Sequence, residues 1–542
     1  MKPSRVLKAA PALFALLAPS AALACGGLFC NTSQPVNQSA ERILFARDAQ
    51  DPAVMHMHVQ IQYQGPPTDF GWLLPVPPDV QTDVGSEQLF TQMDALYGPQ
   101  FQLQTEFVGD CDLALAGGAP SAEADDGGGG RNGGVQVLSR EAVGPYDQAI
   151  LDAETVEDLR RWLDENEFQI PESTDERLQV YIDQGSVFVA LKMLPGADEG
   201  DVAPLHLTFT SPVPGVPIQP TAVAADPDMG ILVHVLGETR AIPLNYRHVE
   251  INDALINWVG GGQNYPDVVS HAVDEVDGGH AFVTDYAGSS EMLANSLQPI
   301  SAELIDRIEG AETFGELVNM FGGTADADLA RVFGLPEGFD AEGVDAGAFW
   351  QCPFCWNFDE NAPIDGMAMA AQLREEVNPA REHLVELAQH HPYLTRLYTT
   401  LSPEEMNRDP LFAFNSDLPA VPNIRTATQV IDCRDDNFQA QSITTPSGYV
   451  IALEDGAQPE TVVRQDGETI RGADSTGAAV VSSFFESGPP MIITDNREEI
   501  SQDYSGGAGE DGGCDCNATS NNATAPWLLG LVGLLGLRRR RR

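Results

Sequence analysis

The sequence predicts an α+β fold, with strands and helices in mixed blocks that form one large domain or two. Segments with apolar residues at alternate positions, typical of half-buried strands, dominate the first half of the chain and return near its C-terminal end. Segments with apolar residues three and four apart, typical of amphipathic helices, gather mainly in the middle. Strict alternation of strand and helix would indicate a parallel α/β sheet, and the sequence does not show it.

The clearest strand runs from Met55 to Tyr63. Its odd-numbered residues are apolar, whereas the even-numbered positions carry His56, His58, Gln60 and Gln62, so one face is apolar and the other polar. The patterns predict further strands over 42–46, 70–76, 135–138, 187–194, 205–209, 231–236, 449–453, 461–464 and 480–485.

Helices are expected where apolar residues share one helical face. Over Thr155–Glu167 these residues are Val156, Leu159, Trp162 and Leu163. In Leu373–His390, Pro379 is expected to break the helix or to begin a new one. Similar spacing predicts helices over 89–97, 267–276 and 304–321.

Both ends of the chain carry targeting features. Residues 1–24 have a basic start, an apolar stretch and an Ala22-Leu23-Ala24 cleavage motif, which together predict a signal peptide cut after Ala24. A family core is expected over 25–430, with a mobile Gly- and Asp-rich insertion at 110–134. A strand-rich extension over 431–500 and an acidic, Gly-rich stalk over 501–513 are expected to follow.

Residues 514–542 combine Cys514-Asp515-Cys516, a short apolar run from Trp527 to Leu537 and five terminal arginines. An ordinary membrane helix needs about 20 apolar residues, so this run is too short for a conventional span. The tail resembles the myxobacterial C-terminal sorting tail. The resemblance implies cleavage near the cysteines, a lipid link through Cys514 or Cys516, and a place on the outer cell surface. The expected partners are the export machinery, a tail-processing protease and the membrane.

The chain is strongly acidic, with 29 Lys and Arg residues against 80 Asp and Glu residues and a formal net charge of −51. Such a surface repels nucleic acids, so nucleic-acid binding is excluded.

Six cysteines lie before the tail, and an even number in an exported chain favours disulfides. Their connectivity is open. Proximity favours Cys25–Cys30 and Cys352–Cys355, which leaves Cys111–Cys433 as the long-range bridge.

Several segments resemble an uncharacterised exported bacterial family, of the DUF2330 type, from about Cys25 to Ala427. The segments that carry the resemblance include CGGLFC from Cys25, VQIQYQG from Val59, GWLLPVP from Gly71, and PYLTRLYTTLS from Pro392. The resemblance implies export and supplies no catalytic residues.

Cys352-Pro353-Phe354-Cys355 is the sharpest local motif. A C-x-x-C pair serves as a redox site where a helix N-terminus stabilises the first thiolate, or as half of a zinc site. No helical pattern follows it and no second ligand pair is near in sequence, so a structural disulfide is the favoured interpretation.

The sequence offers no recognisable catalytic motif and predicts no cofactor. His56 and His58 project to one side of a strand and could seed a metal site, but a solvated sheet face is favoured. The leading hypothesis is a surface-anchored binding or envelope-structural protein rather than an enzyme. A thiol oxidoreductase using Cys352 and Cys355 is the alternative, and a metal-dependent hydrolase is a weaker one.

Overall fold

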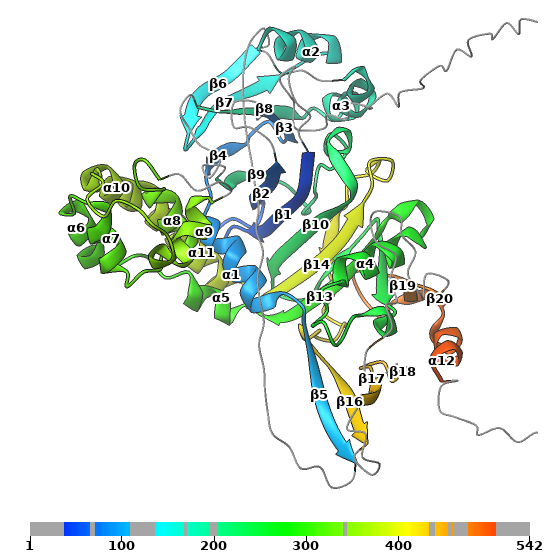
Figure 1. Ribbon diagram of the computed structural model, residues 1–542. Helices are drawn as coiled ribbons and strands as arrows, with labels where there is room; N and C mark the ends of the chain where they lie inside the picture. The colour runs from blue at the N-terminus through cyan, green and yellow to red at the C-terminus, as the bar shows by residue number, and fades with distance from the viewer. Residues whose placement is uncertain are drawn as a thin grey trace, which may run out of the picture.

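Four layers make up the core of the chain in the computed structural model (Figure 1). Helices cover one face of a large sheet, a smaller sheet packs on its other face, and two further helices cover the smaller sheet. The structure describes residues 37–64, 71–108, 136–166, 168, 171–194, 203–339, 344–432, 440–453, 458 and 475–505.

Within these residues the large sheet has ten strands in the order β20-β19-β12-β13-β14-β10-β1-β2-β9-β4. β1 and β2 form an antiparallel hairpin, while β1 pairs in parallel with β10 on its other side, so the sheet is mixed. Its strands are β1 (Asn37–Arg47), β2 (Val54–Gln64), β4 (Gln81–Val84), β9 (Leu205–Thr210), β10 (Ala225–Gly237), β12 (Arg247–Ile251), β13 (Ala281–Ser289), β14 (Tyr393–Leu401), β19 (Ala478–Ser483) and β20 (Met491–Asp495).

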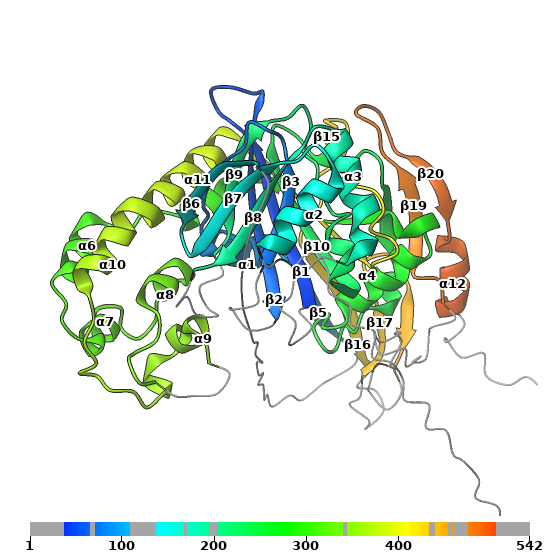
Figure 2. The same ribbon diagram turned by 90° about the horizontal axis from the view of Figure 1, so that it is seen from above.

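The smaller sheet has the described order β3-β8-β7-β6 and packs on the apolar face of β1 and β2. Met57 and Val59 of β2 share this core with Trp72 and Leu74. Two helices cover the outer face of the small sheet (Figure 2). The first buries Leu159 and Trp162 against it, and the second buries Leu178. These elements are β3 (Gly71–Val76), β6 (Gln136–Val143), β7 (Tyr146–Asp152), β8 (Val187–Met193), α2 (Val156–Glu165) and α3 (Asp175–Asp183).

Three helices cover the opposite face of the large sheet and bury its polar row. Leu89 and Phe90 from the first, Leu293 from the second and Leu384 from the third pack with Leu44 of β1. The helices are α1 (Glu87–Tyr97), α5 (Glu291–Ser296) and α11 (Asn378–His390), whereas α4 (Tyr265–Asp274) packs on the other side.

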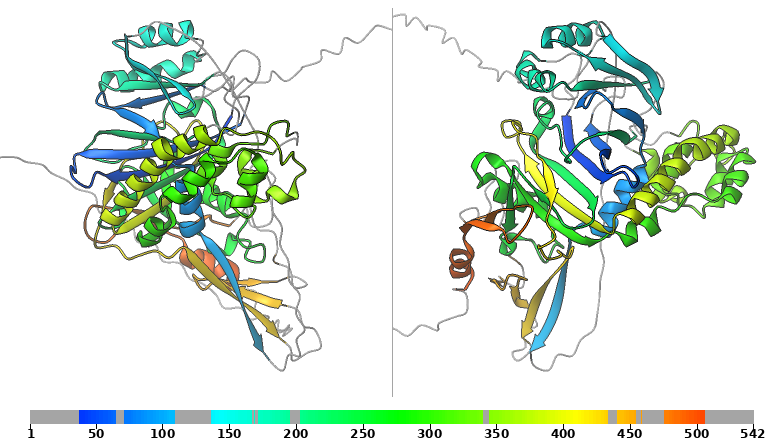
Figure 3. Two further views of the ribbon diagram at one scale, coloured as in Figure 1. Left: turned by 90° about the vertical axis from the view of Figure 1, so that its left-hand side faces the viewer. Right: turned by 180° about the vertical axis from the view of Figure 1, so that it is seen from behind.

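A helical unit with its own core extends from the large sheet (Figure 3). Its centre is aromatic, with Phe314, Phe349 and Trp350 in mutual edge and tilted contact. A π-helical turn, η8 (Leu373–Val377), joins this unit to α11. Its helices are α6 (Ala302–Glu309), α7 (Phe314–Met320), α8 (Ala327–Phe333), α9 (Ala346–Gln351) and α10 (Gly366–Gln372).

A long ribbon projects from the large sheet, built on the parallel pair β5 and β16 (Figure 1). Phe101 at its base packs edge-on against Trp258. The remaining elements are β5 (Gln100–Val108), β16 (Ile424–Asp432), β17 (Ala440–Thr444), β18 (Val450–Ala452), the pair β11 (Ala241–Pro243) and β15 (Phe412–Phe414), and α12 (Arg497–Ser505).

The α+β prediction is confirmed, and most of the predicted strands and helices are present. The helix predicted over 304–321 is two helices, because Thr313 caps a new one and its side chain accepts a bond from the backbone N–H of Glu316. Pro379 lies in the first turn of α11, where its missing N–H costs nothing. The strand predicted over 461–464 and the insertion at 110–134 lie outside the described residues.

Candidate metal centre

Two neighbouring strands bring three histidines to one face of the large sheet. Residues alternate in direction along β2, so His56 and His58 point the same way. The antiparallel register places His206 of β9 directly opposite His58 and Thr208 opposite His56. Side chains opposed in this way are neighbours across the strands.

A fourth histidine comes from the covering helix α11. Leu384 and Leu387 of α11 are buried against the sheet, and His383 beside them reaches the same region. The ring of His383 lies 4.4 Å from that of His56 and 4.9 Å from that of His206, measured between centroids.

The ligand atoms of His56, His206 and His383 all lie within 4.8 Å of one another. Nδ1 of His56 is 2.9 Å from Nε2 of His206. In a tetrahedral zinc site with Zn–N bonds of about 2.0–2.1 Å, neighbouring ligand nitrogens lie roughly 3.3 Å apart. Small side-chain shifts would therefore place one metal ion between the three rings.

Asp48 orients the ring of His56. Its Oδ2 is 3.2 Å from His56 Nε2, and its Oδ1 accepts bonds from the backbone N–H groups of Gln50 and Asp51, at 2.8 and 2.7 Å. Burial acts to raise the pKa of Asp48, but these N–H groups and His56 outweigh it and hold the pKa below its ordinary value. An ionised carboxylate only accepts hydrogen bonds, so His56 Nε2 carries the hydrogen. Nδ1, which lies 2.9 Å from His206 Nε2, then keeps the lone pair that can bind a metal.

The rings of His206 and His383 are neutral at ordinary pH. Burial, followed by the nearby rings of His383 and His56, lowers the pKa of His206 to about 3. Burial, followed by His56, lowers the pKa of His383 to about 4. Neutral imidazole is the form that binds metal ions, so the cluster needs no loss of protons from these two rings to take one up.

Two further features distinguish this cluster from an ordinary buried core. Nε2 of His383 is buried without a hydrogen-bond partner among the described residues. Three carboxylates lie near enough to raise the pKa of His383, namely those of Glu386, Asp48 and Asp83. Burial lowers this pKa by more than they raise it. These carboxylates give the approach a negative potential that favours cations.

His58 packs beside the cluster rather than within it. Its ring stacks on that of His206 at 4.3 Å, nearly parallel, and neither of its nitrogens has a partner in the described part of the chain. Burial, followed by His206 and His383, lowers the pKa of His58 well below its ordinary value. His58 is not among the histidines whose ligand atoms converge, so its ring packs against the ligand ring of His206 instead of sharing its ion.

The chain matches the model of the family described as an uncharacterised protein conserved in bacteria, DUF2330, over residues 19–413. The chain belongs to the DUF2330 family. No curated protein and no solved structure matches it. The resemblance predicted from the sequence is therefore confirmed, and the three clustered histidines all lie within the DUF2330 match.

In this DUF2330 chain, the expectation that His56 and His58 lie on a solvated sheet face was wrong. Their exposed fractions are 5% and 1%, because α11 covers that face. Sequence reasoning missed His206 and His383. His206 does lie in a predicted strand and His383 in a predicted helix, but nothing local indicated that the two meet His56.

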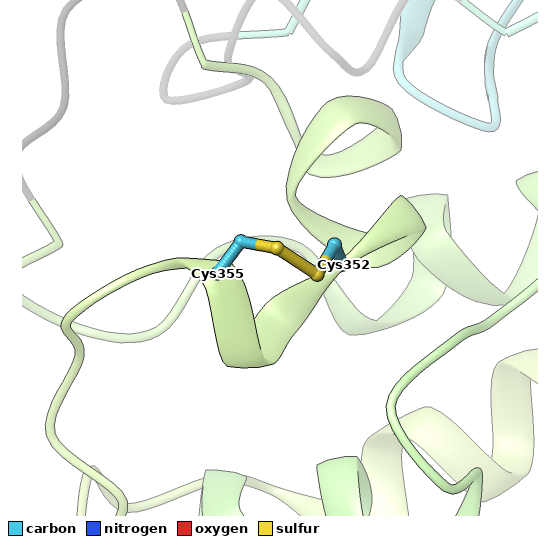
Figure 4. The surroundings of a disulfide bond; sticks show 2 residues. All are labelled: Cys352 and Cys355. Carbon is cyan, nitrogen blue, oxygen red and sulfur yellow. A yellow bond between two sulfur atoms is a disulfide. The ribbon is translucent and has the colours of Figure 1, made fainter. Parts of the chain in front are cut away.

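The C-x-x-C motif forms the disulfide Cys352–Cys355 (Figure 4). Cys352 ends α9, and the bridge encloses the short turn Pro353–Cys355. The C-terminal end of a helix disfavours a thiolate, so this position lacks the feature that activates a redox cysteine. Cys25, Cys30, Cys111, Cys433, Cys514, Cys516 and Ala24 lie outside the described residues.

Among the helices that the structure describes, none has both the length and the apolar character that crossing a membrane requires.

Proposed function

We propose that this chain is an exported, surface-anchored protein that binds a divalent transition-metal ion, with zinc as the leading ion, through His56, His206 and His383. The convergence of three imidazoles from β2, β9 and α11, with their ligand atoms within 4.8 Å, carries the proposal. Imidazole suits zinc, copper and nickel, whereas calcium and magnesium prefer oxygen ligands. Asp48 supplies the carboxylate–histidine contact that is usual behind zinc ligands.

Zinc titration of the purified chain tests metal binding, with calorimetry for affinity and elemental analysis for stoichiometry. The wild-type chain should bind about one zinc ion. His206→Ala and His383→Ala should each lower the affinity at least tenfold, because each leaves only two ligands.

His390→Ala is the matched control, since His390 lies on the same helix α11 but is exposed and outside the cluster. It should bind zinc like the wild type. Circular dichroism confirms that each variant is folded. A wild-type chain that takes up no zinc, or binding that survives both ligand substitutions, would refute the proposal.

The two targeting segments of the sequence support the location part of the proposal. An A-x-A motif at Ala24 and the Cys514–Arg542 tail are the features of a chain that is exported and then held at the surface. Cell fractionation with surface proteolysis tests this. Intact chain in the cytoplasm, with both ends uncut, would exclude it.

A second candidate function is metal-dependent hydrolysis. Three protein ligands leave a fourth position for water, which is the usual pattern of catalytic rather than structural zinc. Hydrolysis of p-nitrophenyl acetate by the zinc-loaded chain, compared with the zinc-loaded His390→Ala and His383→Ala variants, tests it. Equal rates in all three would leave binding as the function of the site.

A further inference from the structure

A second polar site lies where α1 meets the helical unit. A cavity of about 470 Å³ opens there, within the size range of small-molecule sites. Gln60 of β2, Glu87 of α1, Arg331 of α8 and the start of α9 line it. Figure 1 shows α8 and α9 beside α1.

Gln60 presents an unused hydrogen-bond acceptor. Its side chain is 9% exposed, and its Nε2 donates to the carboxyl group of Glu87. Its Oε1 is buried and has no partner among the described residues. A buried acceptor without a partner destabilises the fold, and a ligand donor that reaches it would remove this cost.

Arg331 lines the same cavity and carries a donor without a hydrogen-bond partner among the described residues. Its side chain is 8% exposed, and the nearest carboxylate oxygen that pairs with it, on Glu376, is 4.0 Å from Nη1. Its Nε is buried without a hydrogen-bond partner in the described residues. The chain has 80 acidic residues, so a buried arginine that is only partly paired is unexpected.

Glu87 changes its protonation near neutral pH. Burial raises the pKa of Glu87 to about 7. The charge of Asp328 also raises this pKa, whereas the hydrogen bond from Gln60 and the charges of Arg42 and Arg331 lower it. A carboxyl group that is partly protonated at pH 7 both donates and accepts hydrogen bonds. Perturbed groups of this kind gather at functional sites.

The cavity lining carries charges of both signs. Glu87, Asp326 and Asp345 disfavour an anion, and Arg331 repels a cation that approaches its guanidinium group. The unused groups require a ligand that offers an acceptor to Arg331 and a donor to Gln60 at the same time. Hydroxyl groups do both.

We propose that this cavity binds a small, uncharged, hydroxyl-rich molecule of the sugar class. Arg331 and Gln60 are the recognition residues, and Glu87 supplies a third contact. The proposal is independent of the metal centre. Gln60 lies on the same face of β2 as His56, but none of the three clustered histidines lines the cavity.

Three probes that share one ring and differ in charge test the ligand class: glucose, glucuronate and glucosamine. Saturation-transfer NMR on the full chain should show binding of glucose and at least tenfold weaker binding of the two charged sugars. No binding of glucose at concentrations of about 10 mM, or a preference for either charged sugar, would overturn the proposal. A cavity that holds only water would give the first of these results.

Two substitutions test the recognition residues. Arg331→Met and Gln60→Met keep the length of each side chain and remove its polar atoms, and each should weaken glucose binding at least tenfold. Arg161→Met, on the exposed face of α2, is the control and should leave it unchanged. Gln60→Met leaves the ion pair of Arg331 intact. It therefore tests the site even if the Arg331→Met variant does not fold. Binding that persists in Gln60→Met refutes the proposal.

His383→Ala separates this site from the metal centre. It should lower zinc affinity at least tenfold and leave glucose binding unchanged. Failure of zinc binding in the wild type would refute the metal proposal alone.

Discussion

Asp48 shows how one carboxylate outside the cluster controls its chemistry. It lies in the turn between β1 and β2, where two backbone N–H groups hold it against His56. It fixes the hydrogen on Nε2 of His56, and the other nitrogen, Nδ1, lies 2.9 Å from Nε2 of His206. The residue is therefore a positioning group for the metal site.

Asp48→Asn should lower zinc affinity by about 10–100-fold, the usual cost of losing a carboxylate behind a ligand. The amide removes the charge and can present an N–H to His56, which would favour the wrong tautomer. Zinc calorimetry measures the change. Asp51→Asn is the control, since Asp51 lies in the same turn and its side chain caps Ala53 instead. Equal affinities in both variants would remove Asp48 from the site.

Glu87 gives a stability effect with a defined sign. Its folded pKa of about 7 lies above the unfolded value of about 4.3, so the native state binds more protons between these values. Glu87 therefore stabilises the folded state more below about pH 4.3 than above about pH 7. Its contribution to the free energy of unfolding falls as the pH rises between these two values.

Glu87→Gln should remove this decline, because the amide is neutral at every pH and keeps a contact with Gln60. We expect the variant to be more stable than the wild type at pH 8 by about 1–3 kcal/mol, with little difference at pH 5. Urea unfolding at the two pH values measures it. An equal stability difference at both would show that Glu87 does not titrate in this window.

At the scale of elements, the ribbon of β5 and β16 relates two distant parts of the chain. The two strands are parallel and in register from Gln100 opposite Ile424 to Val108 opposite Asp432. Parallel strands point their carboxyl ends the same way, so the chain leaves both at one tip. Cys433 follows β16 directly, and Cys111 comes three residues after β5.

The register therefore supports the bridge Cys111–Cys433 that was proposed from the sequence, although both cysteines lie outside the described residues. Peptide mapping of the unreduced chain should recover a Cys111–Cys433 linked pair. Cys111→Ser with Cys433→Ser should lower the free energy of unfolding by about 2–5 kcal/mol, because the bridge closes a long loop. A linked peptide that joins either cysteine to Cys25 or Cys30 would contradict this connectivity.

At the scale of the whole molecule, the described residues end with α12, which includes residues 501–505 of the predicted stalk. The rest of the predicted stalk and the predicted sorting tail follow in sequence. The proposed metal centre and the cavity lie in the core, while the predicted targeting features lie at the two ends. Binding chemistry and anchoring are thus assigned to separate parts of the chain.

Mass spectrometry of the mature protein should find a C-terminus near Cys514 or Cys516, with the apolar run and the arginines removed. Glycines interrupt the apolar run, so unwinding it for a protease costs less than unwinding a Leu-rich helix. A lipid on Cys514 or Cys516 is expected in the same spectrum. A mature chain that still ends at Arg542 would show that the tail is a plain anchor.

The sequence by itself determined the fold class, most strand and helix positions, the pairing of Cys352 with Cys355 and the family. These depend on periodicity and on near neighbours, which a linear pattern records. Only the tertiary structure decided that His56 is buried and lies 2.9 Å from His206 across 150 positions of sequence, with His383 above both. That arrangement follows from strand order and from which helix covers which face. Long-range packing sets both of these, and a local pattern has no record of either.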